Sequence, residues 1–324
     1  MFNSIFSIDN EQSFNEACLA VFDFQYRHNA IYQKYVDYLG KSTTAIQHYT
    51  EIPFLPIEFF KSQTIVSTDK EPQIVFSSSG TTGMQTSKHY VADLSYYEQS
   101  FRQCFEAFYS DPKDMVILAL LPNYLEREGS SLIYMVDDLL QQSAQPESGY
   151  FLYNHEELFQ TLQKLKAENK KTLLIGVTYA LLDFCENYKV DFPELMVMET
   201  GGMKGKRKEM IREELHSILT AGFGVTKIHS EYGMTELLSQ GYSYGDGLFA
   251  TPAWMKILIR DTNDPLTLID QHKTGAINVI DLANYYSCSF IATQDLGRMH
   301  TNRQFEILGR FDNSDIRGCN LLVQ

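Results

Sequence analysis

The sequence lacks the features that mark secreted, zinc-binding or membrane-spanning proteins. It has five cysteines, an odd number, and none forms a Cys-x-x-Cys or Cys/His pair with zinc-site spacing. No apolar run approaches the ~20 residues of a membrane span. The first residues, MFNSIFSIDNEQSF, contain neither the basic region nor the long apolar run of a signal peptide. We therefore expect reduced thiols in a cytoplasmic protein without a membrane span.

Basic residues are also scarce. The chain has 27 Lys and Arg against 41 Asp and Glu, and its formal net charge is −14. This balance argues against binding nucleic acid or an anionic membrane through overall charge. An anionic substrate would need a local site of cations or backbone amides. The 324 residues are 44% hydrophobic, which is ample for a large core.

Hydrophobic periodicity predicts a mixed α/β fold. Apolar residues at three-to-four spacing predict one or two helices over 10–40 and further helices over 94–110, 130–143, 155–170 and 206–222. Apolar runs predict strands within 115–122, 172–178 and 192–202, and the proline-containing segment 52–60 is expected to be extended. The alternation favours a largely parallel sheet covered on both faces. After Thr251, short apolar runs and turns predict a β-rich region.

One stretch, IVFSSSGTTGMQTSKHY over residues 74–90, contains a run of hydroxyl and glycine residues from Ser77 to Gly83. A strand, a Ser/Thr/Gly loop and then a helix gather backbone N–H groups and hydroxyls around anionic oxygens. The GxxxxGK[ST] pattern of P-loop ATPases is absent, because Met84 and Gln85 follow Gly83. Taken alone, such a run is more often a surface turn.

Three later regions contain further motifs: METGGMKG over 198–205, HSEYGMTE over 229–236, and ATQDLGRM with EILGRFDNSDIRG over 292–318. Each is weak alone, since Glu236 would also suit a helix start, Asp295 a turn and Arg310 a surface ion pair. In their order, from Ser77 to Asp312, they resemble the motifs of the adenylate-forming superfamily. That superfamily includes acyl-CoA synthetases, peptide-synthetase adenylation domains and luciferases.

Four stretches resemble one branch of that superfamily more closely: LPNYLEREGSSLIYMVDDLL, GVTYALLDF, EYGMTELLSQGY and RGCNLL. They are similar to the acyl-protein synthetase of the bacterial bioluminescence fatty-acid reductase complex, the long-chain-fatty-acid–luciferin-component ligase. The resemblance implies the large N-terminal domain of adenylate-forming enzymes, with layered αβαβα sheets and a β-rich subdomain. Only residues 313–324 follow Asp312, so the superfamily's C-terminal lid domain and its lysine are expected to be missing.

The motifs also imply a division of the chain. Residues 1–250 would form the α/β core with the phosphate loop and adenine site. Residues 251–308 would form a β-rich subdomain of the same lobe, and 309–324 a hinge and a C-terminal tail.

The resemblance implies activation of a carboxylic acid, a long-chain fatty acid in this branch, by ATP with Mg²⁺. Acyl-adenylate and pyrophosphate would form. Glu236 would hold Mg²⁺, Thr235 would lie beside the α-phosphate, and Lys88 would add a cation, although the superfamily's loop lysine lies closer to the last glycine. The β- and γ-phosphates would be held by the loop residues Ser78, Ser79, Gly80, Thr81, Thr82 and Gly83. The adenosine would contact Gly201, Gly202, Met203, Tyr232, Gly233, Asp295 and Arg310. Core packing is the alternative for Met203 and Tyr232.

The branch also implies a thiol acceptor within the chain. Cys319 in RGCNLL matches the cysteine that carries the acyl group as a thioester, and Arg317 would lower its pKa from the usual ~8.5. A free cysteine in a C-terminal tail is the alternative. Cys18, Cys104 and Cys185 lie in apolar helical patterns and Cys288 in an expected strand. His89 and His229 lie inside motifs, where contact with substrate or phosphate and a packing or capping role are equally compatible with the pattern.

Two other classes of function stay open. One is a CoA-dependent acyl or aryl ligase resembling phenylacetate–CoA ligases, and the other is a non-enzymatic acyl-binding scaffold. Intact Glu236, Asp295 and Arg310 argue against the scaffold. The expected partners are the carboxylic acid and an acyl-reductase or other acyl-acceptor protein, with no nucleic acid. A homo-oligomer is compatible with the sequence, which specifies neither the acid nor the pathway.

Overall fold

The computed structural model describes residues 5–78, 86–122, 129–201 and 210–310. The chain forms two compact units. One comprises the residues up to Thr68 together with the chain from Ala253 onward, and the other comprises Asp69–Pro252. The first and last parts of the sequence therefore belong to the same unit.

The Asp69–Pro252 unit is built on a mixed sheet with the strand order β10-β9-β8-β7-β6-β4-β5. Neighbours from β5 to β8 pair in parallel, which confirms the parallel sheet predicted from the strand–helix alternation, whereas β9 is antiparallel to both β8 and β10. Every residue of β4 and β6 is buried, as expected for strands covered on both faces. The strands are β4 Val116–Leu120, β5 Gly149–Phe151, β6 Thr172–Val177, β7 Met196–Thr200, β8 His229–Tyr232, β9 Gly241–Ser243 and β10 Leu248–Ala250.

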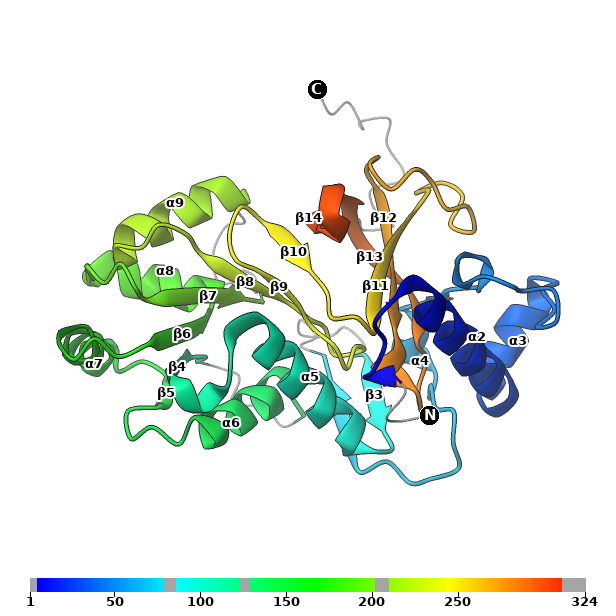
Figure 1. Ribbon diagram of the computed structural model, residues 1–324, viewed down its shortest axis with the longest axis horizontal. Helices are drawn as coiled ribbons and strands as arrows, with labels where there is room; N and C mark the ends of the chain where they lie inside the picture. The colour runs from blue at the N-terminus through cyan, green and yellow to red at the C-terminus, as the bar shows by residue number, and fades with distance from the viewer. Residues whose placement is uncertain (1–4, 79–85, 123–128, 202–209, 311–324) are drawn as a thin grey trace. The chain divides into compact units, whose positions relative to one another are not determined.

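Helices cover both faces of this sheet. In Figure 1, α8 and α9 lie on one side of β6 and β7, and α5 and α6 lie on the other. The rings of Phe184 and Phe223 stack at 5.5 Å and join α8 to α9. The helix expected over 206–222 begins only at Arg212. The helices are α5 Leu94–Tyr109, α6 Ser131–Ser143, α7 His155–Ala167, α8 Thr178–Asn187 and α9 Arg212–Phe223, with a 3₁₀ turn η2 at Pro112–Asp114.

A separate antiparallel hairpin carries the two ends of the Ser/Thr/Gly loop. It consists of β2 Ile74–Ser77 and β3 Lys88–Val91, with Ser77 opposite Lys88. The strand–loop–helix order expected from the sequence is therefore wrong in one respect, because a second strand stands between the loop and α5. The burial of β3 alternates along KHYV, so these four residues fit a half-covered strand.

The other unit contains an antiparallel sheet, β11-β12-β13-β14, with β1 added parallel to β13. This confirms the β-rich region predicted after Thr251. Its strands are β1 Leu55–Pro56, β11 Met255–Arg260, β12 Gly275–Asp281, β13 Phe290–Met299 and β14 Phe305–Arg310. Its helices are α2 Glu11–His28, α3 Ala30–Tyr38 and α4 Phe59–Ser62, with 3₁₀ turns η1 Tyr49–Glu51, η3 Leu282–Asn284 and η4 Thr301–Arg303.

Asn29 divides the N-terminal helical region into α2 and α3. Its backbone N–H donates to Gln25 O and ends α2, and its side chain accepts from the Tyr32 backbone N–H and begins α3. The Gln25 side chain donates to Ser289 Oγ at 3.1 Å and accepts from the Ser289 backbone N–H at 2.9 Å. These buried hydrogen bonds join α2 to the start of β13.

Two local predictions are corrected in this unit. The segment 52–60, expected to be extended throughout, contains only the two-residue strand β1 before α4 begins at Phe59. Cys288 lies just before β13 and not in a strand, because the chain turns there between η3 and β13. Like Cys18, Cys104 and Cys185, it is a buried free thiol.

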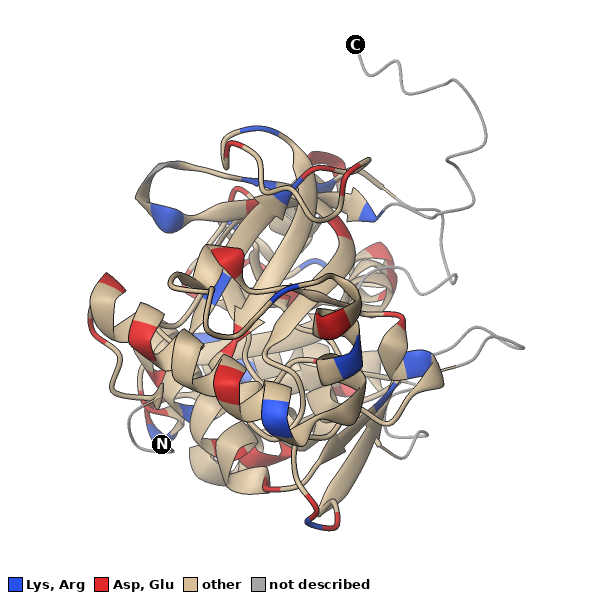
Figure 2. Cartoon of the chain, turned by 90° about the vertical axis from the view of Figure 1, so that its right-hand side faces the viewer, with Lys and Arg blue, Asp and Glu red and all other residues tan. Residues whose placement is uncertain are grey.

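Lys and Arg positions are interspersed among Asp and Glu positions along the chain, as the colouring of Figure 2 shows. Of the helices within the described residues, none combines the length and apolar character needed to cross a bilayer. With a net charge of −14, the chain would have to bind an anion through a local site.

Candidate active site

The described ends of the Ser/Thr/Gly loop are held by a network of backbone hydrogen bonds. Ser78 N–H donates to Ser87 O at 3.0 Å, and Ser87 N–H donates to Ser78 Oγ at 2.8 Å. Ser77 N–H donates to the carbonyl of Gly129, whose φ of +80° favours glycine. Lys88 is exposed at the base of the loop. Of the proposed loop residues, Ser79, Gly80, Thr81, Thr82 and Gly83 lie outside the described residues.

The segment YGMTE follows the carboxyl end of β8. Ligands of open α/β sheets commonly bind at the carboxyl ends of parallel strands, and β6, β7 and β8 all end at this edge. Glu236 is only 6% exposed. The Thr235 carbonyl accepts a hydrogen bond from His89 Nδ1 at 2.8 Å. The structure thus brings the loop hairpin and the Thr235–Glu236 turn together, although their positions are far apart in the sequence.

His89 is fully buried on β3. Burial lowers the pKa of His89 to about 4, so its imidazole is neutral at pH 7. A carbonyl oxygen can only accept a hydrogen bond, so the proton of the neutral ring is on Nδ1. Of the roles compatible with the sequence, this hydrogen bond to the Thr235 carbonyl favours a packing or capping role for His89.

A pair of carboxylates within the sheet was not identified as functional from the sequence. Glu199 on β7 accepts a hydrogen bond from Thr178 Oγ1 at 3.1 Å, and Glu231 on β8 accepts one from Thr200 Oγ1 at 2.6 Å. The available signal was a Glu inside the largely apolar strand of VMETGG, whereas the Glu of HSEYG lies in a polar strand and gave no such signal. Buried carboxylates require such partners, because an unpaired buried charge is strongly destabilising.

Glu199 is 9% exposed, and the side chains of His216 and Arg212 lie near it. Its Oε1 lies 3.7 Å from His216 Nε2. Burial acts to raise the pKa of Glu199, but the neighbouring side chains of His216, Ser230 and Arg212 together lower it, and the net pKa lies below its usual value. Glu199 is therefore ionised at neutral pH, immediately before Thr200 and Gly201.

The two segments expected at the adenine are also linked. Gly201, at the end of β7, is exposed and has φ of +78°, and the adjacent Thr200 donates to Glu231. At Gly233, an added Cβ would lie 2.3 Å from Glu231 Oε1, so any other residue would require the Glu231 carboxylate to shift. Tyr232 is 9% exposed, and its ring lies 6.1 Å from that of Phe249. Gly202 and Met203 lie outside the described residues.

In the other unit, the structure places Asp295 and Arg310 opposite each other. They are cross-strand partners on β13 and β14, and Arg310 Nε lies 3.7 Å from Asp295 Oδ1. The Arg310 side chain is 66% exposed, so this pair contributes little to stability and its guanidinium is accessible. The buried Arg260 donates to the carbonyls of Ile277 and Thr293, both at 2.6 Å, and so secures β13 shortly before Asp295.

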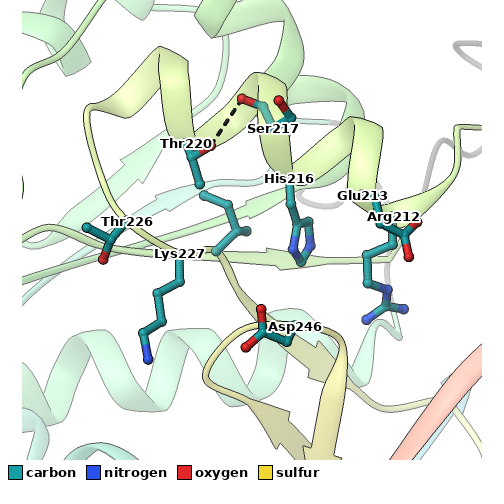
Figure 3. Close-up of a pocket in the computed structure, with 9 residues that line it drawn as sticks. Arg212, Glu213, His216, Ser217, Thr220, Thr226, Lys227 and Asp246 are labelled. Carbon is teal, nitrogen blue, oxygen red and sulfur yellow. Dashed lines mark hydrogen bonds between the residues drawn. The ribbon is translucent and has the colours of Figure 1, made fainter.

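A pocket of about 460 Å³ lies beside α9 (Figure 3). His216 points from α9 toward the turn that carries Asp246, and Arg212 lines the same space. The cations Arg212 and Lys227 are balanced by Glu213 and Asp246. This balanced lining favours neither anions nor cations, and the charge of Arg212 also acts on Glu199.

No protein-family model matches the sequence, and no curated protein matches it in sequence. Solved structures do match. An open conformation of 2-hydroxyisobutyryl-CoA ligase in complex with 2-HIB-AMP and CoA is 12% identical with a TM-score of 0.68, over 94% of this chain and 70% of that one. ATP-bound MatB from Rhodopseudomonas palustris is 15% identical with a TM-score of 0.56, over 73% of this chain. The fold is that of adenylate-forming ligases.

The match to MatB spans about half of that protein, 47% of its length.

Within this ligase fold, the predicted site residues fall into three groups. Ser78 and Lys88 adjoin the Thr235–Glu236 turn through His89. The ends of β7 and β8 meet through Thr200 and Glu231. Asp295 pairs with Arg310 in the other unit. Cys319 lies outside the described residues. Across the part of the chain that is described, no cluster of three or more His, Cys, Asp or Glu side chains is placed to hold a metal ion.

Proposed function

We propose that this protein is an ATP-dependent acid–thiol ligase that activates a carboxylic acid as an acyl-adenylate. The contact between the loop hairpin and the turn carrying Glu236 carries the proposal, because a phosphate-binding loop and a metal-binding carboxylate must act on the same triphosphate. The fold supports it, since ATP-bound MatB and a CoA ligase bound to 2-HIB-AMP share this architecture.

In the first half-reaction, a carboxylate oxygen attacks the α-phosphorus of ATP. The new oxygen–phosphorus bond forms as the bond to the bridging oxygen breaks, and pyrophosphate leaves. Backbone amides and hydroxyls of residues 78–83, with Lys88, would hold the β- and γ-phosphates, and Thr235 would lie beside the α-phosphate. Lys88 is exposed at the base of the loop, where its cation can reach an anionic ligand.

Glu236 fits a role as the protein ligand of Mg²⁺. It is a buried carboxylate, and Mg²⁺ prefers oxygen ligands and commonly combines one or two carboxylates with substrate phosphates and water. The absence of a three-ligand cluster among the described residues agrees with such a site. When bound, the ion would offset negative charge on the phosphates.

The adenosine contacts are part of the same proposal. Gly201, with the adjoining Gly202 and Met203, would flank the adenine beside Tyr232 and Gly233. Asp295 would accept hydrogen bonds from the ribose hydroxyls, and Arg310 would contact the same ribose or a phosphate. The pairing of Asp295 with an exposed Arg310 supports a shared ligand for these two side chains.

In the second half-reaction, a thiolate attacks the acyl carbonyl of the adenylate. A carbon–sulfur bond forms, the bond to the AMP oxygen breaks, and AMP leaves. We assign this role to Cys319 on the resemblance of RGCNLL, with a long-chain fatty acid as substrate and an acyl-reductase or another protein as the final acceptor. Burial raises the pKa of both Cys185 and Cys288 to about 12, which makes these thiols poor nucleophiles.

CoA is the alternative acceptor, favoured by the fold shared with a ligase whose structure contains CoA. The test is pyrophosphate release with MgATP and fatty acids of several chain lengths, followed by mass spectrometry of the protein with and without CoA. Acid-dependent pyrophosphate release with an acylated protein in the absence of CoA supports the protein thiol. Acyl-CoA without protein acylation supports the CoA ligase, and no pyrophosphate release with any acid refutes ligase activity.

Cys319→Ser identifies the acceptor within the chain. It should leave pyrophosphate release intact and remove hydroxylamine-labile labelling by a clickable fatty acid, because a serine hydroxyl lacks the acidity of a thiol. Cys288→Ser is the control and should label like the wild type. Undiminished thioester labelling of Cys319→Ser would reject this cysteine.

A further inference from the structure

We propose that His89 is a positioning residue that fixes the β2–β3 hairpin, which bears the two ends of the Ser/Thr/Gly loop, relative to Glu236. This inference rests on the proposed function, in which the loop holds phosphates and Glu236 holds their metal ion. The sequence offered two roles for His89, contact with substrate or phosphate, or a packing or capping role. The hydrogen bond from His89 Nδ1 to the Thr235 carbonyl favours the second, with the side chain linking two backbone segments of the site.

On the loop side, His89 is rigidly placed by the hairpin. It lies opposite Phe76 on β2, next to the Ser77–Lys88 pair that closes the loop. Side chains alternate along a strand, and here Lys88 is exposed while His89 and Val91 are buried. The hairpin therefore directs Lys88 outward at the loop and the imidazole of His89 inward. A displacement of the loop ends would move the imidazole with them.

On the turn side, the hydrogen bond acts directly on the backbone of Glu236. The carbonyl that accepts from His89 Nδ1 at 2.8 Å belongs to the peptide bond between Thr235 and Glu236. Because a peptide unit is planar, holding its oxygen also orients the N–Cα bond of Glu236. The same turn is closed by Leu237 N–H donating to Met234 O at 3.0 Å. The imidazole thus orients the peptide unit from which the Glu236 residue extends.

The segment after Glu236 is held independently by α5. Ser100 and Ser239 hydroxyls share a hydrogen bond of 2.9 Å, and Cys104 Sγ donates to Gln240 O at 3.4 Å. Loss of the His89 hydrogen bond should therefore loosen the connection between loop and turn while leaving the following segment anchored. This separates a positioning role from a general packing role, in which the whole unit would be destabilised.

The test compares His89→Leu, which removes the donor, with His89→Asn, whose amide nitrogen can replace Nδ1. His28→Leu is the matched control, because His28 Nδ1 contacts the backbone carbonyl of Phe24 at the same 2.8 Å on an exposed helix face of the other unit. Hydrogen exchange of the unliganded proteins is measured first. ATP–pyrophosphate exchange is then measured at a temperature where each variant is folded.

In His89→Leu, amides of β2, β3 and Leu237 should exchange about tenfold faster, while those of β4 and β6 keep their wild-type rates. The KM for MgATP should rise about tenfold with an unchanged KM for the acid. His89→Asn should bring both the amide exchange rates and the KM for MgATP most of the way back to their wild-type values. His28→Leu should change neither. Unchanged exchange in His89→Leu, or equal acceleration throughout the unit, would overturn the positioning role.

The exchange measurement does not depend on catalysis. If it follows the expected pattern but the wild type releases no pyrophosphate with any acid, the proposed function fails and the link stands. If His89→Leu does not fold, His89→Asn and His89→Gln give the same comparison, because Gln places its amide one carbon farther from the backbone. Equal exchange at β2, β3 and Leu237 in those two variants would then refute the link.

Discussion

Replacing Gly233 by alanine tests the contact that joins the ends of β7 and β8. An added Cβ would lie 2.3 Å from Glu231 Oε1, below the 3.0 Å limit of real contacts, so the carboxylate must move by at least 0.7 Å (3.0 − 2.3). The carboxylate is not free to move, because its other oxygen accepts from Thr200 Oγ1 at 2.6 Å.

The expected loss of stability follows from that hydrogen bond. A hydrogen bond to a charged group contributes about 1.5–3 kcal/mol. The φ of Gly233 is not in the left-handed region, so alanine fits the backbone and also reduces the conformational freedom of the unfolded chain. That reduction stabilises the folded protein by about 0.4–1 kcal/mol and offsets part of the loss. Gly233→Ala should therefore lower the free energy of unfolding by about 1–2 kcal/mol.

Urea denaturation of a double-mutant cycle measures this contact. In the Glu231→Ala background, Gly233→Ala meets no carboxylate and should be neutral or stabilising by up to about 1 kcal/mol. Gly149→Ala, where an added Cβ has no neighbour within 4 Å, is the control and should not destabilise the protein. Equal effects of Gly233→Ala in both backgrounds would refute the steric argument.

Three further predictions concern the site. Glu236→Gln should slow ATP–pyrophosphate exchange at least ~100-fold, which corresponds to a loss of about 2.7 kcal/mol of transition-state stabilisation. An exchange rate near that of the wild type would remove Glu236 from the mechanism. Thr81→Val should weaken MgATP binding by about tenfold without changing the urea midpoint, whereas normal binding in a calorimetric titration would leave the loop without a phosphate role. The pKa of His89 is about 4 in the folded chain, against an ordinary value of 6.5. The contribution of the neutral His89 side chain to the free energy of unfolding is therefore complete above pH 6.5 and is lost as pH falls toward 4. When the pH falls from 7.5 to 5, the free energy of unfolding measured in urea should drop by about 2 kcal/mol more in the wild type than in His89→Asn. Equal drops in the two proteins would contradict a buried neutral imidazole.

Much of the architecture could be predicted from local sequence pattern. The apolar runs of β4 and β6 and the three-to-four spacing of α5, α6 and α7 each reflect burial within a single element, which periodicity reports directly. The short elements β3 and α4 were not predicted, because four residues contain too little periodicity to distinguish a strand or helix from a loop. Cys288 was misplaced for the same reason, at the boundary of β13.

The types of the site residues were likewise readable from the sequence, because Ser/Thr/Gly runs and isolated acids in YGMTE and TQDLG carry recognisable chemistry. The contacts that these residues make could not be read from the sequence. His89 meets the Thr235 carbonyl across 146 positions, and Thr200 meets Glu231 across 31. The first contact depends on how the β2–β3 hairpin packs against the turn after β8, and the second on β7 and β8 becoming neighbours in the sheet; no local propensity encodes either choice. The placement of α2 against β13 through Gln25 and Ser289, 264 positions apart, has the same cause: only the packed tertiary structure can satisfy a buried amide with a partner so distant in the chain.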